Sequence, residues 1–251
     1  MAGVGGYRRM GDEYVTRDPW LNDVAVSAVT GLVLTLPVVA ARVATPSGVL
    51  AGAFFTAWMS YQGGAPTLVA FACLVVFGSL SSRAGRARKE VLGVAQEGGG
   101  RRAFKHVLAN AGPAATALFF GLLFPQFHDA SVAAACGALA GTLSDTVSGE
   151  IGMLVSSPPR LLLIGPIVRR GTDGGMTYVG VMAGVVTAAL VALAVTPWNL
   201  RWVSVFAAGV MGTLSDSVLG ATIERRRLIG NEGVNFVSGA LAAATAWSLE
   251  S

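Results

Sequence analysis

Most of this chain consists of long apolar runs separated by short polar segments. Each run has roughly the 17 to 25 residues that a helix needs to cross a bilayer. A polar segment of mixed charge, residues 1–23, comes first and lacks the basic start and immediate apolar core of a secretory signal. The pattern predicts eight membrane-spanning helices, at Val24–Ala41, Val43–Tyr61, Ala65–Ser82, Val107–Pro125, Ala130–Val155, Met176–Pro197, Trp202–Glu224 and Val234–Leu249.

The first two predicted spans share one apolar stretch, from Val24 to Ser60, that is too long for a single crossing. Arg42, Pro46 and Gly48 interrupt it and predict a turn in its middle. We therefore expect an all-α, polytopic transmembrane bundle. Its parts are a polar tail (1–23), a single transmembrane domain (24–251) and, within that domain, a basic loop (83–106).

Composition supports the bilayer as the surroundings of the chain. Of its 251 residues, 53% are hydrophobic and 13% are charged, whereas about a quarter of a soluble domain is charged. No long basic stripe with interleaved aromatic residues lies outside the apolar runs, which argues against nucleic acid as a partner. Cys73 and Cys136 both fall inside apolar runs, so we expect buried free thiols and neither a disulfide framework nor a cysteine metal site.

The cations alternate from loop to loop and predict the orientation. They gather in Arg83–His106, in Ser156–Gly175 and in Arg225–Arg227, while the intervening loops hold few. Short loops rich in Lys and Arg stay in the cytoplasm, so we expect these loops inside and both termini outside. The net charge of +4 and the lack of a transit peptide favour a prokaryotic plasma membrane.

A nine-residue segment occurs twice. Gly141-Thr-Leu-Ser-Asp-Thr-Val-Ser-Gly149 returns 71 residues later as Gly212-Thr-Leu-Ser-Asp-Ser-Val-Leu-Gly220. The copies fall on spans five and seven, which run in the same direction, so we expect an internal parallel repeat with both copies at the same depth. Close helix packing explains the glycines equally well, but it does not explain the aspartates.

Four acidic side chains fall within these two spans: Asp145 and Glu150 in the fifth, Asp216 and Glu224 in the seventh. An ionisable group in the hydrocarbon costs about 2.5 to 3.5 kcal/mol, so such groups usually line a polar cavity. Asp145 and Glu150 are about 140° apart on an ideal helix, so we expect an unwound turn near Gly149 if both serve one site. The alternative, that the acids pair with arginines of other helices, is weakened because no arginine lies at that depth.

A glycine-rich turn, Arg169-Arg170-Gly171-Thr172-Asp173-Gly174-Gly175, lies just before span six. Its backbone N–H groups and the start of the next helix are suited to an anion, although the same residues are also ordinary turn formers.

Carboxylates, cations and a glycine turn at one membrane face suit phosphoryl or nucleotidyl transfer. Oxygen ligands hold Mg²⁺, the ion bridges nucleotide phosphates, and cations neutralise the charge that develops. The duplicated Asp145 and Asp216 are the expected metal ligands, and the run Gly98–Gly100, followed by Arg101 and Arg102, is expected to fold over a ligand. His106 and His128 are far apart in depth, and no GxSxG, HExxH or cysteine cluster is present.

Five ordered motifs resemble the phytyl-phosphate kinase and transmembrane protein 19 family, at residues 107–112, 144–152, 171–175, 212–222 and 234–236. The likeness covers about 104–247. It implies an integral membrane enzyme that phosphorylates an isoprenoid monophosphate to the diphosphate with CTP or another nucleoside triphosphate. The chain departs from the family pattern where Leu143-Ser144 precede Asp145, in place of Asn-Ala, and at Glu224, often Gln, which leaves the nucleotide and isoprenoid preference open.

The working hypothesis is a Mg²⁺-dependent prenyl-phosphate kinase of the cytoplasmic face, with CTP and a phytyl- or geranylgeranyl-type monophosphate as substrates. Asp145 and Asp216 would hold Mg²⁺, and Glu150 would be a third ligand or orient the acceptor phosphate. The residues expected to bind substrate or nucleotide are Arg101, Arg102, Lys105, Asn110, Arg169, Arg170, Gly171, Asp173, Gly174, Glu224 and Asn235.

Three alternatives remain open. A lipid or isoprenoid transporter or flippase would also use a repeat with intramembrane acids, but it needs polar groups on both sides of the midplane. A cytidylyltransferase making a CDP-lipid would release pyrophosphate where a kinase releases CDP. A structural membrane protein gives no reason for the duplicated aspartates. The oligomeric state is also left open, a homo-oligomer included.

Overall fold

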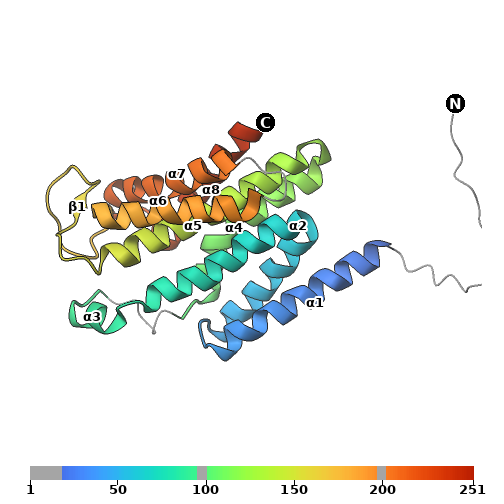
Figure 1. Cartoon of the computed structure of the whole chain (residues 1–251), viewed down its shortest axis with the longest axis horizontal. Coiled ribbons are helices and arrows are strands. Elements are labelled where there is room, and N and C mark those ends of the chain that lie inside the picture. Colours follow the sequence, from blue (N-terminus) through green and yellow to red (C-terminus); the bar gives the residue numbers. More distant parts are fainter. Residues whose placement is uncertain (1–18, 95–100, 197–201) are drawn as a thin grey trace, which may run out of the picture.

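The computed structural model describes residues 19–94, 101–196 and 202–251, and nearly all of them lie in helices (Figure 1). Most of the predicted tail (1–18), Gly98–Gly100 and Arg201 lie outside the described residues. The helices are α1 (Pro19–Ala40), α2 (Pro46–Arg83), α3 (Arg86–Val91), α4 (Phe104–Leu123), η2 (Pro125–Phe127), α5 (His128–Gly152), α6 (Tyr178–Val195), α7 (Trp202–Leu219), η4 (Gly220–Glu224) and α8 (Asn231–Glu250), with two short antiparallel strands, β1 (Arg160–Leu161) and β2 (Gly175–Met176).

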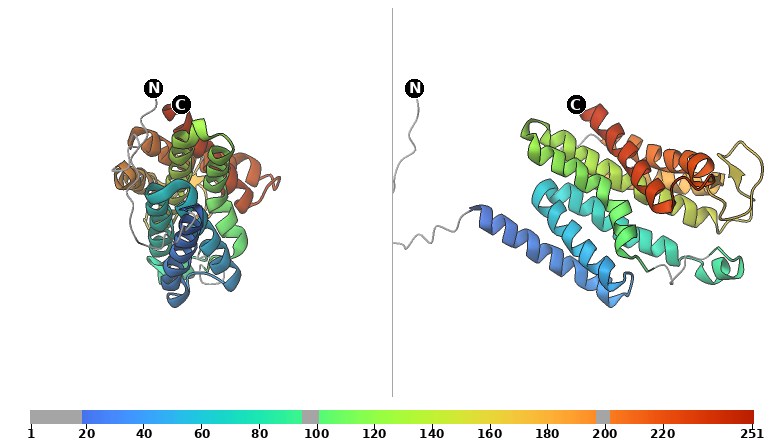
Figure 2. Two further views of the ribbon diagram at one scale, coloured as in Figure 1. Left: turned by 90° about the vertical axis from the view of Figure 1, so that its right-hand side faces the viewer. Right: turned by 180° about the vertical axis from the view of Figure 1, so that it is seen from behind.

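Helix α2 consists of two arms that reverse direction at Gly64 (Figures 1 and 2). Gly64 has φ +62° and ψ −151°, a conformation open essentially to glycine alone. Across the reversal, Thr67 Oγ1 donates a hydrogen bond to the carbonyl oxygen of Met59 at 2.8 Å. The arms correspond to predicted spans two and three.

Helix α5 is the central element and packs against α2, α4, α6, α7 and α8. Its sequence is rich in alanine, glycine and serine, whose small side chains allow backbones to approach. At the closest point, an added Cβ on Gly212 of α7 would lie 2.4 Å from Cα of Gly141. These two glycines open the two copies of the repeated segment, so the copies lie side by side on neighbouring helices.

The polar loops gather at one end of the bundle (Figures 1 and 2). This end holds α3, the segment between α5 and α6 with its two strands, and η4. Arg83 is tied to the α1–α2 turn there, because its guanidinium donates to the carbonyl oxygen of Ala41 at 2.7 Å. The clustering of cations that the loop pattern predicted is therefore a feature of the fold, and this end is called the basic end below.

Five helical segments among the described residues are long and apolar enough to cross a membrane: α2, α4, η2 with α5, α6, and α7 with η4. The all-α membrane class is confirmed. Eight crossings and the parallel repeat as a structural unit stay predictions. Helix α1 begins at Pro19, within the predicted tail of residues 1–23.

Candidate functional site

A polar cavity of about 200 Å³ opens at the basic end of the bundle. The end of α5, the segment before α6, the end of α7 with η4, and Asn231 at the start of α8 surround it. Seven of the residues expected from the sequence border this cavity: Asp145, Arg170, Gly171, Asp173, Gly174, Asp216 and Glu224.

Four of these residues are carboxylates, and they face one another. The negative charge of Asp145 interacts with those of Asp216 and Glu224, and Asp173 acts on Asp216 and Glu224. Ser238 Oγ donates a hydrogen bond to Asp216 Oδ2 at 3.2 Å. Among the described residues no Lys, Arg or His forms an ion pair with any of the four. Mutual repulsion in a partly desolvated cavity favours the binding of a cation.

The glycine turn forms one wall of the cavity. Gly171 and Gly174 have φ of +78° and +72°, which glycine adopts without strain. A Cβ at Gly174 would lie 2.5 Å from the Ala221 side chain, so the turn packs directly on η4. In the described part of the chain, the N–H groups of Gly171, Asp173 and Gly174 have no backbone acceptor. Amides without a backbone acceptor in a glycine turn are suited to phosphate oxygens.

Arg170 holds this wall in place. Its guanidinium donates to the carbonyl oxygens of Met153 at 3.4 Å, Ser156 at 2.8 Å and Ser157 at 3.2 Å. These bonds join the turn to the segment that leaves α5. Arg170 borders the cavity as expected, and some of its N–H donors are already bonded to carbonyl oxygens of the loop.

Helix α7 continues into a π-helix, Gly220–Glu224, at the end of the predicted span Trp202–Glu224. Gly220 packs closely on the glycine turn, since an added Cβ there would lie 2.9 Å from the Gly174 nitrogen. Asp216 and Glu224 nevertheless reach the same cavity. Single π-turns of this kind occur frequently at functional sites.

Glu150 lies elsewhere. Its Oε2 is 2.5 Å from Lys89 Nζ of α3, and both side chains are almost fully buried. Lys89 also donates to the carbonyl oxygen of Ser81 at 3.0 Å. Helix α5 remains helical through Gly149, so the expected unwound turn is wrong, and Glu150 does not border the cavity of Asp145. Its partner is a lysine from the basic loop. The expectation from the sequence considered only arginines within the spans as partners for the acids, and so did not include this lysine.

The remaining expected residues lie outside the polar cavity. Arg102 and Asn110 border a second, apolar cavity, and Asn235 Nδ2 donates to Asn110 Oδ1 at 3.3 Å. Lys105 forms an exposed ion pair with Glu232 at 2.9 Å. Arg101 donates to the Ala44 carbonyl oxygen at 3.4 Å, and Arg169 is exposed.

The chain matches, over residues 29–243, the family described as integral membrane protein DUF92. It belongs to this family. Membership of DUF92 and the relatives below confirm the family resemblance drawn from the five motifs, and they establish a multi-pass integral membrane protein.

Three curated relatives of this DUF92 protein are informative. An uncharacterized membrane protein of Methanocaldococcus jannaschii is 30% identical over 216 residues, 85% of this chain and 88% of the relative. Protein PGR of Arabidopsis thaliana is 29% identical over 220 residues, 66% of this chain and 76% of the relative. Protein VTE6, chloroplastic, from the same plant is 28% identical over 205 residues, 75% of this chain and 59% of the relative. No solved structure matches the chain.

The donor set of the cavity is compatible with Mg²⁺. No group of three or more His, Cys, Asp or Glu side chains in the described ranges is arranged to hold a metal by itself. Mg²⁺ is usually held by one or two carboxylates together with substrate phosphates and water, and does not need an all-protein cage. Asp145 and Asp216 provide two such carboxylates beside the free amides of the glycine turn.

The cavity is also lined by polar residues that the sequence did not single out: Ser148, Thr172, Thr177, Ser217 and Asn231. Two of them could have been found from their positions. Thr172 lies inside the glycine turn, and Ser217 directly follows the duplicated aspartate. Thr177 caps α6, since its hydroxyl accepts from the Gly180 N–H at 3.1 Å, so its role in the fold is independent of any ligand.

Proposed function

We propose that this DUF92 protein is a membrane kinase that transfers the γ-phosphoryl group of a nucleoside triphosphate, CTP in the first instance, to an isoprenoid monophosphate. The observation that supports it is the meeting of Asp145, Asp216 and the glycine turn Gly171–Gly175 at one cavity of the basic end. The relationship to VTE6 and PGR is consistent with such an enzyme.

In this proposal the nucleotide phosphates lie along the glycine turn, where the N–H groups of Gly171, Asp173 and Gly174 donate to them. Asp145 and Asp216 would hold Mg²⁺, which when bound neutralises phosphate charge. Arg170 keeps the turn in position through its three carbonyl contacts. The cavity opens at the basic end, so a soluble nucleotide enters from that side, which we propose to be cytoplasmic.

The transfer itself needs little acid or base chemistry. An oxygen of the acceptor monophosphate attacks the γ-phosphorus, and the bond from that phosphorus to the β–γ bridging oxygen breaks. The electron pair leaves with the nucleoside diphosphate. Because the acceptor is already an anion, no proton has to be removed first, and positioning with charge neutralisation supplies the rate enhancement.

A direct test uses the purified protein in detergent with geranylgeranyl monophosphate, Mg²⁺ and CTP labelled in the γ-phosphate. We expect labelled diphosphate and free CDP, and a loss of at least a hundredfold in Asp145→Asn. The matched control is Asp129→Asn, since Asp129 lies exposed in the first turn of the same helix, away from the cavity. Equal activity of Asp145→Asn and wild type would contradict the metal assignment. Release of pyrophosphate with formation of a CDP-lipid would identify a cytidylyltransferase instead.

A further inference from the structure

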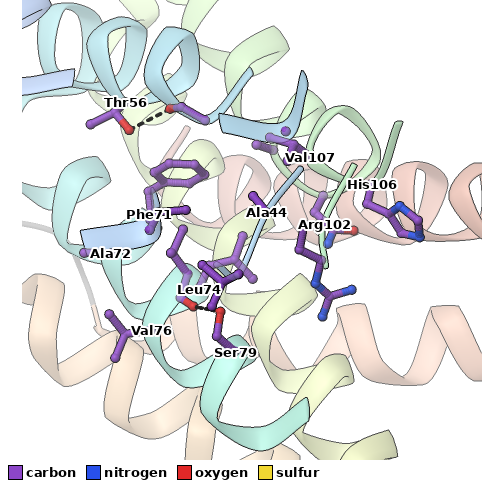
Figure 3. Close-up of a pocket in the computed structure, with 18 of the residues that line it drawn as sticks. Ala44, Thr56, Phe71, Ala72, Leu74, Val76, Ser79, Arg102, His106 and Val107 are labelled. Carbon is purple, nitrogen blue, oxygen red and sulfur yellow. Dashed lines mark hydrogen bonds between the residues drawn. The ribbon is translucent and has the colours of Figure 1, made fainter. Parts of the chain in front are cut away.

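A second cavity, of about 250 Å³, lies between α1, the two arms of α2 and the start of α4. Its wall is almost entirely apolar over most of its length, with Leu34, Phe71 and Leu74 among the lining residues. The polar side chains of the lining include Arg102, His106, Asn110 and Thr146, while the hydroxyls of Thr56 and Ser79 are bonded to the carbonyl oxygens of Gly52 and Val75 in their own helix. In Figure 3, Arg102 and His106 lie together on one side of the cavity, with Thr56, Phe71, Ala72 and Val76 on the other.

The backbone fixes Arg102 at this end. Its N–H donates to the carbonyl oxygen of Val43 at 2.9 Å, and its carbonyl oxygen accepts from the N–H of Thr45 at 3.0 Å. Gly48 makes room for the contact, since an added Cβ there would overlap the Arg102 carbonyl. The start of α4 is thus clamped to the α1–α2 turn, and the Arg102 backbone is fixed at this end of the cavity by main-chain bonds.

The Arg102 guanidinium is a partly buried cation. Within the described residues its side chain donates to Ser82 Oγ at 3.2 Å, whereas a guanidinium carries five N–H donors. Burial lowers the pKa of Arg102 from its ordinary value, and the negative charge of Glu150 opposes that change. Nearby, His106 Nδ1 is buried and has no hydrogen-bond partner in the described part of the chain. An anionic group at this end of the cavity would accept from the remaining N–H donors of the Arg102 guanidinium.

We propose that this cavity binds the hydrocarbon chain of a single-chain isoprenoid phosphate, with the phosphate against Arg102 at the basic end. The inference rests on the proposed function and places its acceptor substrate. The cavity exceeds the roughly 150 Å³ of an apolar protein cavity that binds benzene, so it takes a branched hydrocarbon segment. Helix α1 packs against α2 at the edge of the bundle, so this side of the cavity lies at the periphery of the molecule (Figure 2).

The two cavities lie on adjacent faces of α5. Asp145 borders the polar cavity and Thr146 the apolar one, and consecutive helical residues point about 100° apart. Hydrogen bonds connect the two sides. Asn110 Oδ1 accepts from Asn235, and Ser238 Oγ lies within hydrogen-bond distance of both the Asn235 carbonyl oxygen, at 3.1 Å, and Asp216 Oδ2, at 3.2 Å, so its one hydroxyl hydrogen is given to either. These polar groups link the polar end of the apolar cavity to the wall that carries Asp216.

Gly52 allows the cavity to be filled without disturbing its wall. It borders the cavity, and an added Cβ would meet no atom within 4 Å. The variant Gly52→Phe therefore occupies the space intended for the chain, and Gly52→Ala leaves most of it open. The matched control is Leu50→Phe on the same arm of α2, because the Leu50 side chain is 74% exposed and faces away from the bundle.

The experiment measures binding of geranylgeranyl monophosphate to the purified full chain by native mass spectrometry, without nucleotide. We expect Gly52→Phe to bind at least tenfold more weakly than wild type, and Gly52→Ala and Leu50→Phe to bind normally. The affinity of Arg102→Gln for the monophosphate should be at least tenfold lower than that of wild type. Its affinity for geranylgeraniol, which has no phosphate, should equal that of wild type. Unchanged binding by Gly52→Phe, or equal competition by a two-chain phosphatidic acid, would overturn the proposal.

These outcomes separate the two proposals, since binding is read without catalysis. Binding that depends on Gly52 and Arg102, with no phosphoryl transfer, retains the lipid site and refutes the kinase. Phosphoryl transfer that is unaffected in Gly52→Phe retains the kinase and refutes the cavity as its acceptor site.

Discussion

Lys89 Nζ lies 2.5 Å from Glu150 Oε2, and the two side chains are 2% and 3% exposed. The pair joins the short helix α3 of the basic loop to the last turn of α5. A buried ion pair is expensive to desolvate, and removing one partner leaves an uncompensated charge. The contact therefore anchors the basic loop beside the polar cavity.

We predict that Lys89→Met destabilises the protein by about 3 to 5 kcal/mol, since it removes the lysine that pairs with the buried Glu150 carboxylate. The double variant Lys89→Met with Glu150→Leu should recover most of that loss, because both charges are gone. Thermal unfolding in detergent measures both. If the double variant retains kinase activity, Glu150 is not a metal ligand. If the double variant is stable but has lost kinase activity, the hypothesis that Glu150 is a third metal ligand is supported.

The contact between Gly141 and Gly212 predicts a second effect. In Gly212→Ala the new methyl group would lie 2.4 Å from backbone, which cannot move away as a flexible side chain can. We expect a loss of about 1 to 3 kcal/mol as α5 and α7 separate. Gly149→Ala is the control, since its Cβ meets nothing within 4 Å and alanine favours the helix. Equal unfolding temperatures of the two variants would show that this contact is not tight.

Gly174→Ala tests the glycine turn. Both Gly174 and Gly93 have positive φ, at +72° and +69°, so alanine is strained at either position. A Cβ at Gly174 also overlaps Ala221, whereas at Gly93 it meets nothing within 4 Å. We expect at least a tenfold rise in the KM for nucleotide in Gly174→Ala and no change in Gly93→Ala, measured as CDP release. Similar values in the two variants would contradict a nucleotide at this turn.

Glu232 gives a pH dependence. Its hydrogen bond with Lys105 lowers the pKa of this carboxyl below its ordinary value of 4.5. A lowered pKa stabilises the fold above pH 4.5, and this stabilisation is lost as the pH falls through the lowered pKa. Because both groups are substantially exposed, we expect Glu232→Gln to cost no more than about 1 kcal/mol at pH 7. The difference from wild type should decrease as the pH falls below 4.5 and vanish below the lowered pKa, where both carboxyls are protonated; a difference that does not decrease with falling pH would assign the effect to another contact.

The sequence by itself was sufficient for the membrane class, the positions of most helices and the core of the polar cavity. Apolar runs must be helical in lipid, because backbone groups find no water there. Asp145 and Asp216 could be predicted because ionisable side chains within spans are costly and usually line a polar cavity, and the turn 171–175 because its glycines are suited to an anion. Their meeting at one cavity agrees with that expectation.

Only the tertiary structure decided where the remaining charged and polar groups lie. Lys89 pairs with Glu150 across a long separation in the chain, and Arg102 is clamped to the α1–α2 turn. No local sequence pattern predicts either contact, because both depend on how α2, α4 and α5 pack. The apolar cavity is likewise a space between helices that are each apolar on several faces. Hydropathy shows that such helices are surrounded by lipid or by protein. Which of the two covers a given face depends on how the helices pack.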